Sequence, residues 1–126
     1  MVERIVPSAN YVQDLGEKEV TDLLLSHSLM LYPQKFEEFG MPPVEGLACG
    51  CVPALHPNVG AADMYARNGE NALFLEDSPE QSATKIKELL DDPIQLSSMR
   101  GTTSSYIDIF NPDRYGQRIL ESADFL

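Results

Sequence analysis

The fold is decided by the stretch Phe36-Glu37-Glu38-Phe39-Gly40-Met41-Pro42-Pro43-Val44-Glu45-Gly46-Leu47-Ala48-Cys49-Gly50. It follows the short apolar run Leu29–Tyr32, which predicts a buried strand. Its second half, Pro42–Cys49, predicts a helix, because prolines are tolerated in a first turn. In an α/β sheet this order places Glu37–Gly40 at the carboxyl end of a strand, where ligands bind.

Working outward, short apolar runs alternate with helical stretches. Further strands are predicted at Val52–Leu55 and Ala72–Leu75, and Ile5-Val6 ends a first strand. Further helices are predicted at Glu17–His27, Ala61–Arg67, Pro79–Leu90, Leu96–Phe110 and Asp113–Phe125. The alternation predicts an α/β fold, a partial Rossmann-like parallel sheet flanked by helices on both faces.

The predicted sheet is small. Three or four strands are visible, whereas an open doubly wound domain usually has about five or six. The chain is either a compact variant or part of a larger domain, and the second interpretation is favoured. Residues 1–126 are expected to form a single, partial domain, with C-terminal helices over about 96–126.

Composition excludes several classes of protein. Hydrophobic residues make up 43% of the 126 residues, as in ordinary globular domains. Lys and Arg number 9 against 20 Asp and Glu, so the net charge of −11 argues against nucleic acid or an anionic membrane surface as a partner. No apolar run approaches the length of a membrane span, and Met1–Arg4 lack the basic start and long apolar stretch typical of a signal peptide, so neither is expected. Cys49 and Cys51 are too close for an unstrained disulfide, which favours thiols in a reducing compartment.

The stretch 36–50 also carries the predicted chemistry. Gly40 lets the backbone approach a ligand closely, and the N–H groups around Gly40 and Met41 at a helix start favour an anion such as phosphate. Glu45 is expected in the first helical turn, within reach of the same ligand. Carboxylates accept hydrogen bonds, so Glu37 and Glu45 suit hydroxyl groups. The structural alternative is that both carboxylates only interact with the helix dipole.

The pattern resembles the retaining glycosyltransferases of the GT-B fold, family 4 (glycosyl transferases group 1). Their motif commonly reads Glu-Gly-Phe-Gly-Leu-Pro-x-x-Glu-Ala-Met-Ala-x-Gly. Glu37 and Glu45 have the motif's seven-residue separation, and five residues between and beyond them also match: Phe39, Gly40, Pro42, Ala48 and Gly50. The resemblance continues through Asn58–Ala61, Arg67–Phe74 and Pro79–Pro93. It runs from about Ile5 to the C-terminus, which corresponds to the later part of the family's C-terminal donor-binding domain.

The resemblance implies a role for each matching residue. Glu37 is the implied catalytic residue and accepts hydrogen bonds from the transferred sugar. The N–H groups of Phe39, Gly40 and Met41 contact the sugar and the diphosphate, and Glu45 holds the ribose hydroxyls. The implied reaction moves a sugar from a nucleoside diphosphate sugar to a saccharide or lipid-linked acceptor, as in polysaccharide biosynthesis. No metal and no other cofactor are expected, and the enzyme is expected in the cytoplasm, contacting the inner face of a membrane only through its other parts.

Some residues depart from the family pattern. Glu38 stands where Gly is frequent, Ala61 replaces the second Gly of a turn, and Lys35 is not at a family position. The family's diphosphate-binding Arg and Lys and its N-terminal acceptor domain are expected outside this sequence. The isolated chain is therefore expected to be inactive, and to need an N-terminal GT-B domain or self-association. The alternative function is a truncated, non-catalytic module that binds a nucleotide or a partner.

Overall fold

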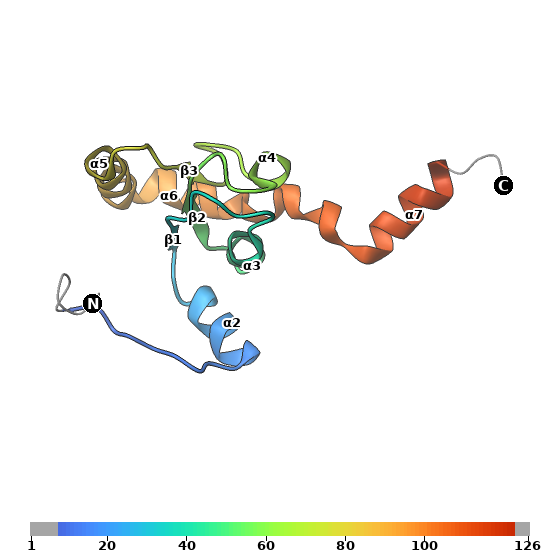
Figure 1. Ribbon diagram of the computed structural model, residues 1–126, viewed down its shortest axis with the longest axis horizontal. Coiled ribbons are helices and arrows are strands. Elements are labelled where there is room, and N and C mark those ends of the chain that lie inside the picture. The colour runs from blue at the N-terminus through green and yellow to red at the C-terminus, as the bar shows by residue number, and fades with distance from the viewer. Residues whose placement is uncertain (1–7, 123–126) are drawn as a thin grey trace.

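The computed structural model describes residues 8–122, which contain a three-stranded parallel sheet (Figure 1). The strands β1 (Leu29–Tyr32), β2 (Val52–Leu55) and β3 (Leu73–Phe74) lie in the order β1-β2-β3. Leu29 pairs with Val52 at one end of the β1–β2 ladder, and both ladders are parallel. The predicted α/β class and parallel sheet are confirmed, whereas Ile5-Val6 lies outside the described residues.

The strands are joined by helices, as expected for a parallel sheet. The chain enters through α2 (Glu17–Leu25) before β1, and α3 (Met41–Ala48) connects β1 to β2. The short α4 (Ala62–Tyr65) connects β2 to β3. After β3 come α5 (Pro79–Leu90), α6 (Pro93–Gly101), the 3-10 helix η1 (Thr103–Phe110) and α7 (Pro112–Ser122).

Both faces of the sheet are covered, because side chains alternate between them along each strand. On one face Tyr32, Leu55 and Phe74 pack into a cluster with residues of α3, α4 and η1. On the other face Leu29, Val52 and Leu73 pack against Leu89 of α5 and Leu96 and Met99 of α6. Between these layers every residue of β2 is buried. This agrees with the predicted doubly covered sheet.

Two helices extend from this layered body. Figure 1 shows α7 pointing away from the sheet beyond η1. No residue of α2 is fully buried, and its Leu23 and Leu25 side chains are exposed. No helix within residues 8–122 has the length and apolar character needed to cross a membrane.

The prediction of one helix over Leu96–Phe110 is wrong. The α-helix begins earlier, at Pro93, because the Asp92 side chain caps it by accepting the Gln95 N–H at 3.0 Å. It ends at Gly101, where the Thr102 hydroxyl donates to the Met99 carbonyl at 3.0 Å. Such hydroxyl–carbonyl bonds compete with the helical ladder, and the chain continues as the 3-10 helix η1.

The helix expected at Ala61–Arg67 is shorter than predicted, and the buried Asn71 side chain explains its end. Asn71 Nδ2 donates to the Tyr65 carbonyl at 2.8 Å. Asn71 Oδ1 accepts the Arg67 N–H at 2.7 Å. Because the amide binds both groups, the chain turns away after Tyr65 instead of adding another helical turn.

Candidate functional site

The predicted site is centred on the loop between β1 and α3, residues 33–40, called here the β1–α3 loop. It lies at the carboxyl end of β1, as the sequence predicted, and leads into α3 through Gly40. Gly40 is the N-cap and is left-handed, with φ 84° and ψ 60°. A Cβ at this position would lie 2.9 Å from Val59 Cγ1 and 3.0 Å from Tyr65 Oη. The local packing and the positive φ both therefore require glycine.

The start of α3 offers few hydrogen-bond donors. Its first residue is Met41, and the next two, Pro42 and Pro43, have no backbone N–H. The first turn of a helix normally leaves four backbone N–H groups free, and at α3 these are reduced to the N–H groups of Gly40 and Met41. Gly40 and Met41 supply two of the three amides that are predicted to contact the sugar and the diphosphate.

Phe39 is held by its ring, which points into the protein. The ring packs edge-on against Phe110, with centroids 5.4 Å apart, and at a tilt against Tyr65 at 6.5 Å. Its side chain thus belongs to the core on one face of the sheet, with α3, α4 and η1. Any contact of Phe39 with a ligand would come from its backbone, which agrees with the role predicted for it.

Glu37 is an exposed residue of the β1–α3 loop, and Tyr32 orients its carboxylate. The Tyr32 hydroxyl donates to Glu37 Oε2 at 3.0 Å. Burial and this hydrogen bond to Glu37 raise the pKa of Tyr32, so the phenol remains a donor at neutral pH. The bond uses one carboxylate oxygen, and a carboxylate can accept further bonds from a ligand's hydroxyl groups.

The placement of Glu45 corrects the sequence analysis. Glu45 is the fifth residue of α3 and is not in the first turn, because the helix begins at Met41. It lies about 6 Å along the helix axis from Met41, at about 1.5 Å per residue. It lines a groove of about 490 Å³ between α2 and α3, together with Val20, Leu24 and Ala48 among others.

A second loop packs directly on the first. Gly60, in the turn after β2, has φ 33°, and a Cβ there would lie 2.4 Å from the Glu38 carbonyl oxygen. The neighbouring Ala61 N–H donates to the Phe39 carbonyl at 3.4 Å. The loops at the carboxyl ends of β1 and β2 therefore pack backbone against backbone, which fixes the β1–α3 loop from one side.

The charge at this edge of the sheet is mainly negative. Glu37 and Glu38 are both exposed, and Lys35, the nearest basic residue in sequence, forms an ion pair with Asp77 at 3.3 Å. Within residues 8–122, no three His, Cys, Asp or Glu side chains are grouped as a metal site. Both cysteines are free thiols, and Cys51 is buried.

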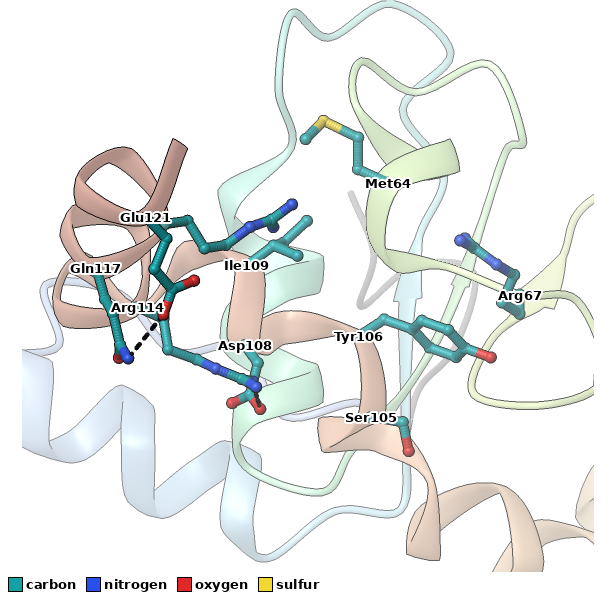
Figure 2. A pocket seen from close by; sticks show the side chains of 10 residues that line it. Met64, Arg67, Ser105, Tyr106, Asp108, Ile109, Arg114, Gln117 and Glu121 are labelled. Atoms are coloured by element: carbon teal, nitrogen blue, oxygen red, sulfur yellow. Dashed lines mark hydrogen bonds and ion pairs between the residues drawn. The ribbon is translucent and has the colours of Figure 1, made fainter. Parts of the chain in front are cut away.

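Another cavity lies away from this loop, between α4, η1 and α7 (Figure 2). It has a volume of about 540 Å³. Figure 2 shows Arg114 directed toward Asp108, with which it forms an ion pair. Arg67 lies over the Tyr106 ring at 4.6 Å from its centroid. None of the predicted site residues lines this cavity.

Comparison with known proteins identifies the family. The sequence model described as glycosyl transferases group 1 matches residues 7–104. The chain belongs to this family. The family's domain is the C-terminal domain of the GT-B fold, in agreement with the parallel sheet described above.

Two relatives of this glycosyl transferases group 1 chain match most of its length. A D-inositol 3-phosphate glycosyltransferase of Rhodococcus jostii is 28% identical over 94% of this chain. An uncharacterized glycosyltransferase of Methanocaldococcus jannaschii is 32% identical over 72% of the chain. The chain spans 26% and 27% of these two relatives, about a quarter of each.

Sequence reasoning missed two tyrosines of this glycosyltransferase domain. Tyr32 ends a predicted strand only five residues before Glu37, and that proximity was a usable signal. Tyr65 donates to the Gly40 and Phe39 carbonyls, 25 and 26 residues away in sequence. No local pattern around Tyr65 indicates such a contact.

Proposed function

We propose that this glycosyltransferase domain binds the donor of a retaining glycosyltransferase. The donor is a nucleoside diphosphate sugar, and the acceptor is a saccharide or a lipid-linked molecule. The observation that carries the proposal is the left-handed Gly40 at the start of α3, with Glu37 Cγ 3.9 Å from the place that a Cβ on Gly40 would take.

The roles follow from the chemistry of each group. A helix N-terminus favours the negative charge of a diphosphate, both as a donor of hydrogen bonds and through the helix dipole. Glu37, oriented by Tyr32, accepts hydrogen bonds from hydroxyls of the sugar. Glu45, in the groove between α2 and α3, accepts hydrogen bonds from the ribose. Donor binding by these groups uses no metal ion.

A second function is favoured by the charges at the site. Glu37 and Glu38 are exposed there, while Lys35 is paired with Asp77. An anionic diphosphate gains little favourable electrostatic interaction from these negative charges. The alternative function is therefore a non-catalytic module, which binds a nucleotide weakly or binds a protein partner. Because the Rhodococcus jostii relative is named a D-inositol 3-phosphate glycosyltransferase, D-inositol 3-phosphate is an acceptor to test beside saccharides.

The test uses a protein that joins this chain to a GT-B N-terminal domain. We expect a product that keeps the anomeric configuration of the donor, read from its anomeric proton coupling. Glu37→Gln and Glu45→Gln each lower transfer, with the thermal midpoint almost unchanged, because both side chains are exposed and such surface substitutions usually change stability by no more than about 0.5 kcal/mol. Glu88→Gln, an exposed carboxylate of α5, is the matched control and retains full activity.

Inversion of configuration would exclude a retaining enzyme. Normal transfer by both Glu37→Gln and Glu45→Gln would remove the assigned roles. Donor binding without transfer to any acceptor, saccharide, lipid-linked or inositol phosphate, would favour the non-catalytic module.

A further inference from the structure

We propose that Tyr65 is a positioning residue, whose hydroxyl aligns the Gly40 and Met41 amides so that they bind the nucleoside diphosphate sugar. This inference rests on the proposed function of the β1–α3 loop. Tyr65 lies in α4, beyond β2, and acts on the ligand through the backbone of that loop rather than by contact.

The planarity of the peptide unit links the Tyr65 hydroxyl to the direction of two amides. The direction of a carbonyl fixes the direction of the N–H of the next residue, because both lie in one plane. Tyr65 Oη lies 3.3 Å from the Gly40 oxygen and 3.5 Å from the Phe39 oxygen, so its hydrogen is shared between them. The Phe39 carbonyl sets the direction of the Gly40 N–H, and the Gly40 carbonyl sets that of the Met41 N–H. The Tyr65 hydroxyl therefore bonds to both of the peptide units that contain the Gly40 and Met41 N–H groups.

Other contacts hold each peptide unit separately. The Ala61 N–H bonds to the Phe39 carbonyl, and an N-cap carbonyl such as that of Gly40 accepts the first bond of its helix. Among the described contacts, the Tyr65 hydroxyl is the one that joins the two units to each other and to the core. This matters at Gly40, because glycine has more backbone freedom than any other residue.

Tyr65 is itself rigidly placed and keeps its proton. Its side chain is fully buried, and its ring packs against Phe39 and Phe110. Burial, followed by the neighbouring Tyr32 and Glu37, raises the pKa of Tyr65 to about 12. The hydroxyl is therefore a donor throughout the neutral range.

Tyr65→Phe tests the proposal by removing the hydroxyl while keeping the ring. Tyr106→Phe is the matched control, because its hydroxyl donates to Glu70 Oε1, at 2.6 Å, and lines the other cavity. The first measurement needs no ligand: ¹⁵N relaxation gives the order parameters of the Gly40 and Met41 N–H vectors. We expect them to fall from about 0.85 to below about 0.6 in Tyr65→Phe. Leu47, inside α3, stays rigid in all three proteins.

The second measurement is an NMR titration with inorganic pyrophosphate and with UDP, GDP, ADP and dTDP. Tyr65→Phe is expected to bind them several-fold more weakly, whereas Tyr106→Phe binds like the unmodified chain. Unchanged Gly40 and Met41 order parameters in Tyr65→Phe would overturn the proposal. So would an equal loss of order at Leu47, which would show a purely structural role. If the unmodified chain binds none of these ligands, the proposed function fails, and the order parameters still decide the role of Tyr65.

Discussion

At the residue scale, the Glu37 carboxylate depends on Tyr32. The hydrogen bond between them is exposed to solvent, and the Tyr32 hydroxyl that donates it is uncharged. Its net contribution to stability is therefore only about 0.5–1.5 kcal/mol. We predict that Tyr32→Phe changes the free energy of unfolding within that range. We also predict a weaker preference for nucleotide sugars over the same nucleotides, because Glu37 is less well oriented. Calorimetric titration with both ligand classes measures this, and an unchanged preference would show that Tyr32 does not orient Glu37.

A pH dependence follows from Tyr65. Burial raises its pKa from 10.0 to about 12 in the folded protein. Between these values the unfolded chain loses the proton and the folded chain keeps it, so the stability present below pH 10 is lost as pH rises toward 12. The full loss is on the order of 3 kcal/mol, since one pKa unit corresponds to about 1.4 kcal/mol.

Urea unfolding of Tyr65→Phe and the unmodified chain across this range isolates the contribution. The other titrating groups are common to both proteins. We expect the stability of the variant to fall less steeply with pH. Parallel curves would show that Tyr65 ionises normally in the folded state.

At the scale of the elements, local signals determined most of what the sequence could predict. The fully apolar runs at β1 and β2 gave the strand bounds, and Ser78-Pro79 gave the start of α5, where the Ser78 hydroxyl accepts the Gln81 N–H. Two contacts between a side chain and the backbone were not predictable, because no periodicity of the sequence encodes them. Asn71 ends α4 by binding the Tyr65 carbonyl six residues before it. The Tyr65 hydroxyl reaches the β1–α3 loop, 25 residues away at Gly40. Likewise, the motif predicts that Glu45 contacts the ligand, but it does not predict in which turn of α3 Glu45 lies, because that depends on the residue at which the helix begins.

The packing of the two loops is tested at Gly60. We predict that Gly60→Ala destabilises the domain by at least about 1–3 kcal/mol, the range for a strained backbone, because its Cβ would meet the Glu38 backbone at 2.4 Å. Gly101→Ala is the control, since nothing lies within 4 Å of a Cβ at the end of α6. It should stabilise the domain by roughly 0.5–1 kcal/mol. Urea unfolding compares the two, and equal stabilities would contradict the described packing.

At the scale of the whole molecule, the edge of the sheet at β1 can pair with a strand of another chain. β1 pairs with β2 on one side only within the described sheet, and Leu31 is 56% exposed. Unpaired strand edges are templates for association with another chain. We predict that this chain self-associates through β1 despite its net charge of −11.

Light scattering coupled to size-exclusion chromatography tests this at several concentrations. We expect the mass to rise above the 14.0 kDa of one chain as concentration increases. Leu31→Lys places a charge on the edge and abolishes the rise, whereas Leu25→Lys, equally exposed on α2, does not. A monomer at every concentration would show that the edge does not pair.

The central claim is that the start of α3 and the loop before it bind a nucleoside diphosphate. The most direct measurement is an NMR titration of the unmodified chain with UDP, GDP, ADP and dTDP. We predict binding on the order of 1 mM, a free energy of about −4 kcal/mol, with the largest shifts at the Phe39, Gly40 and Met41 amides. Shifts gathered instead around Arg67 and Tyr106 of the Figure 2 cavity, or no shifts with any nucleotide, would contradict it.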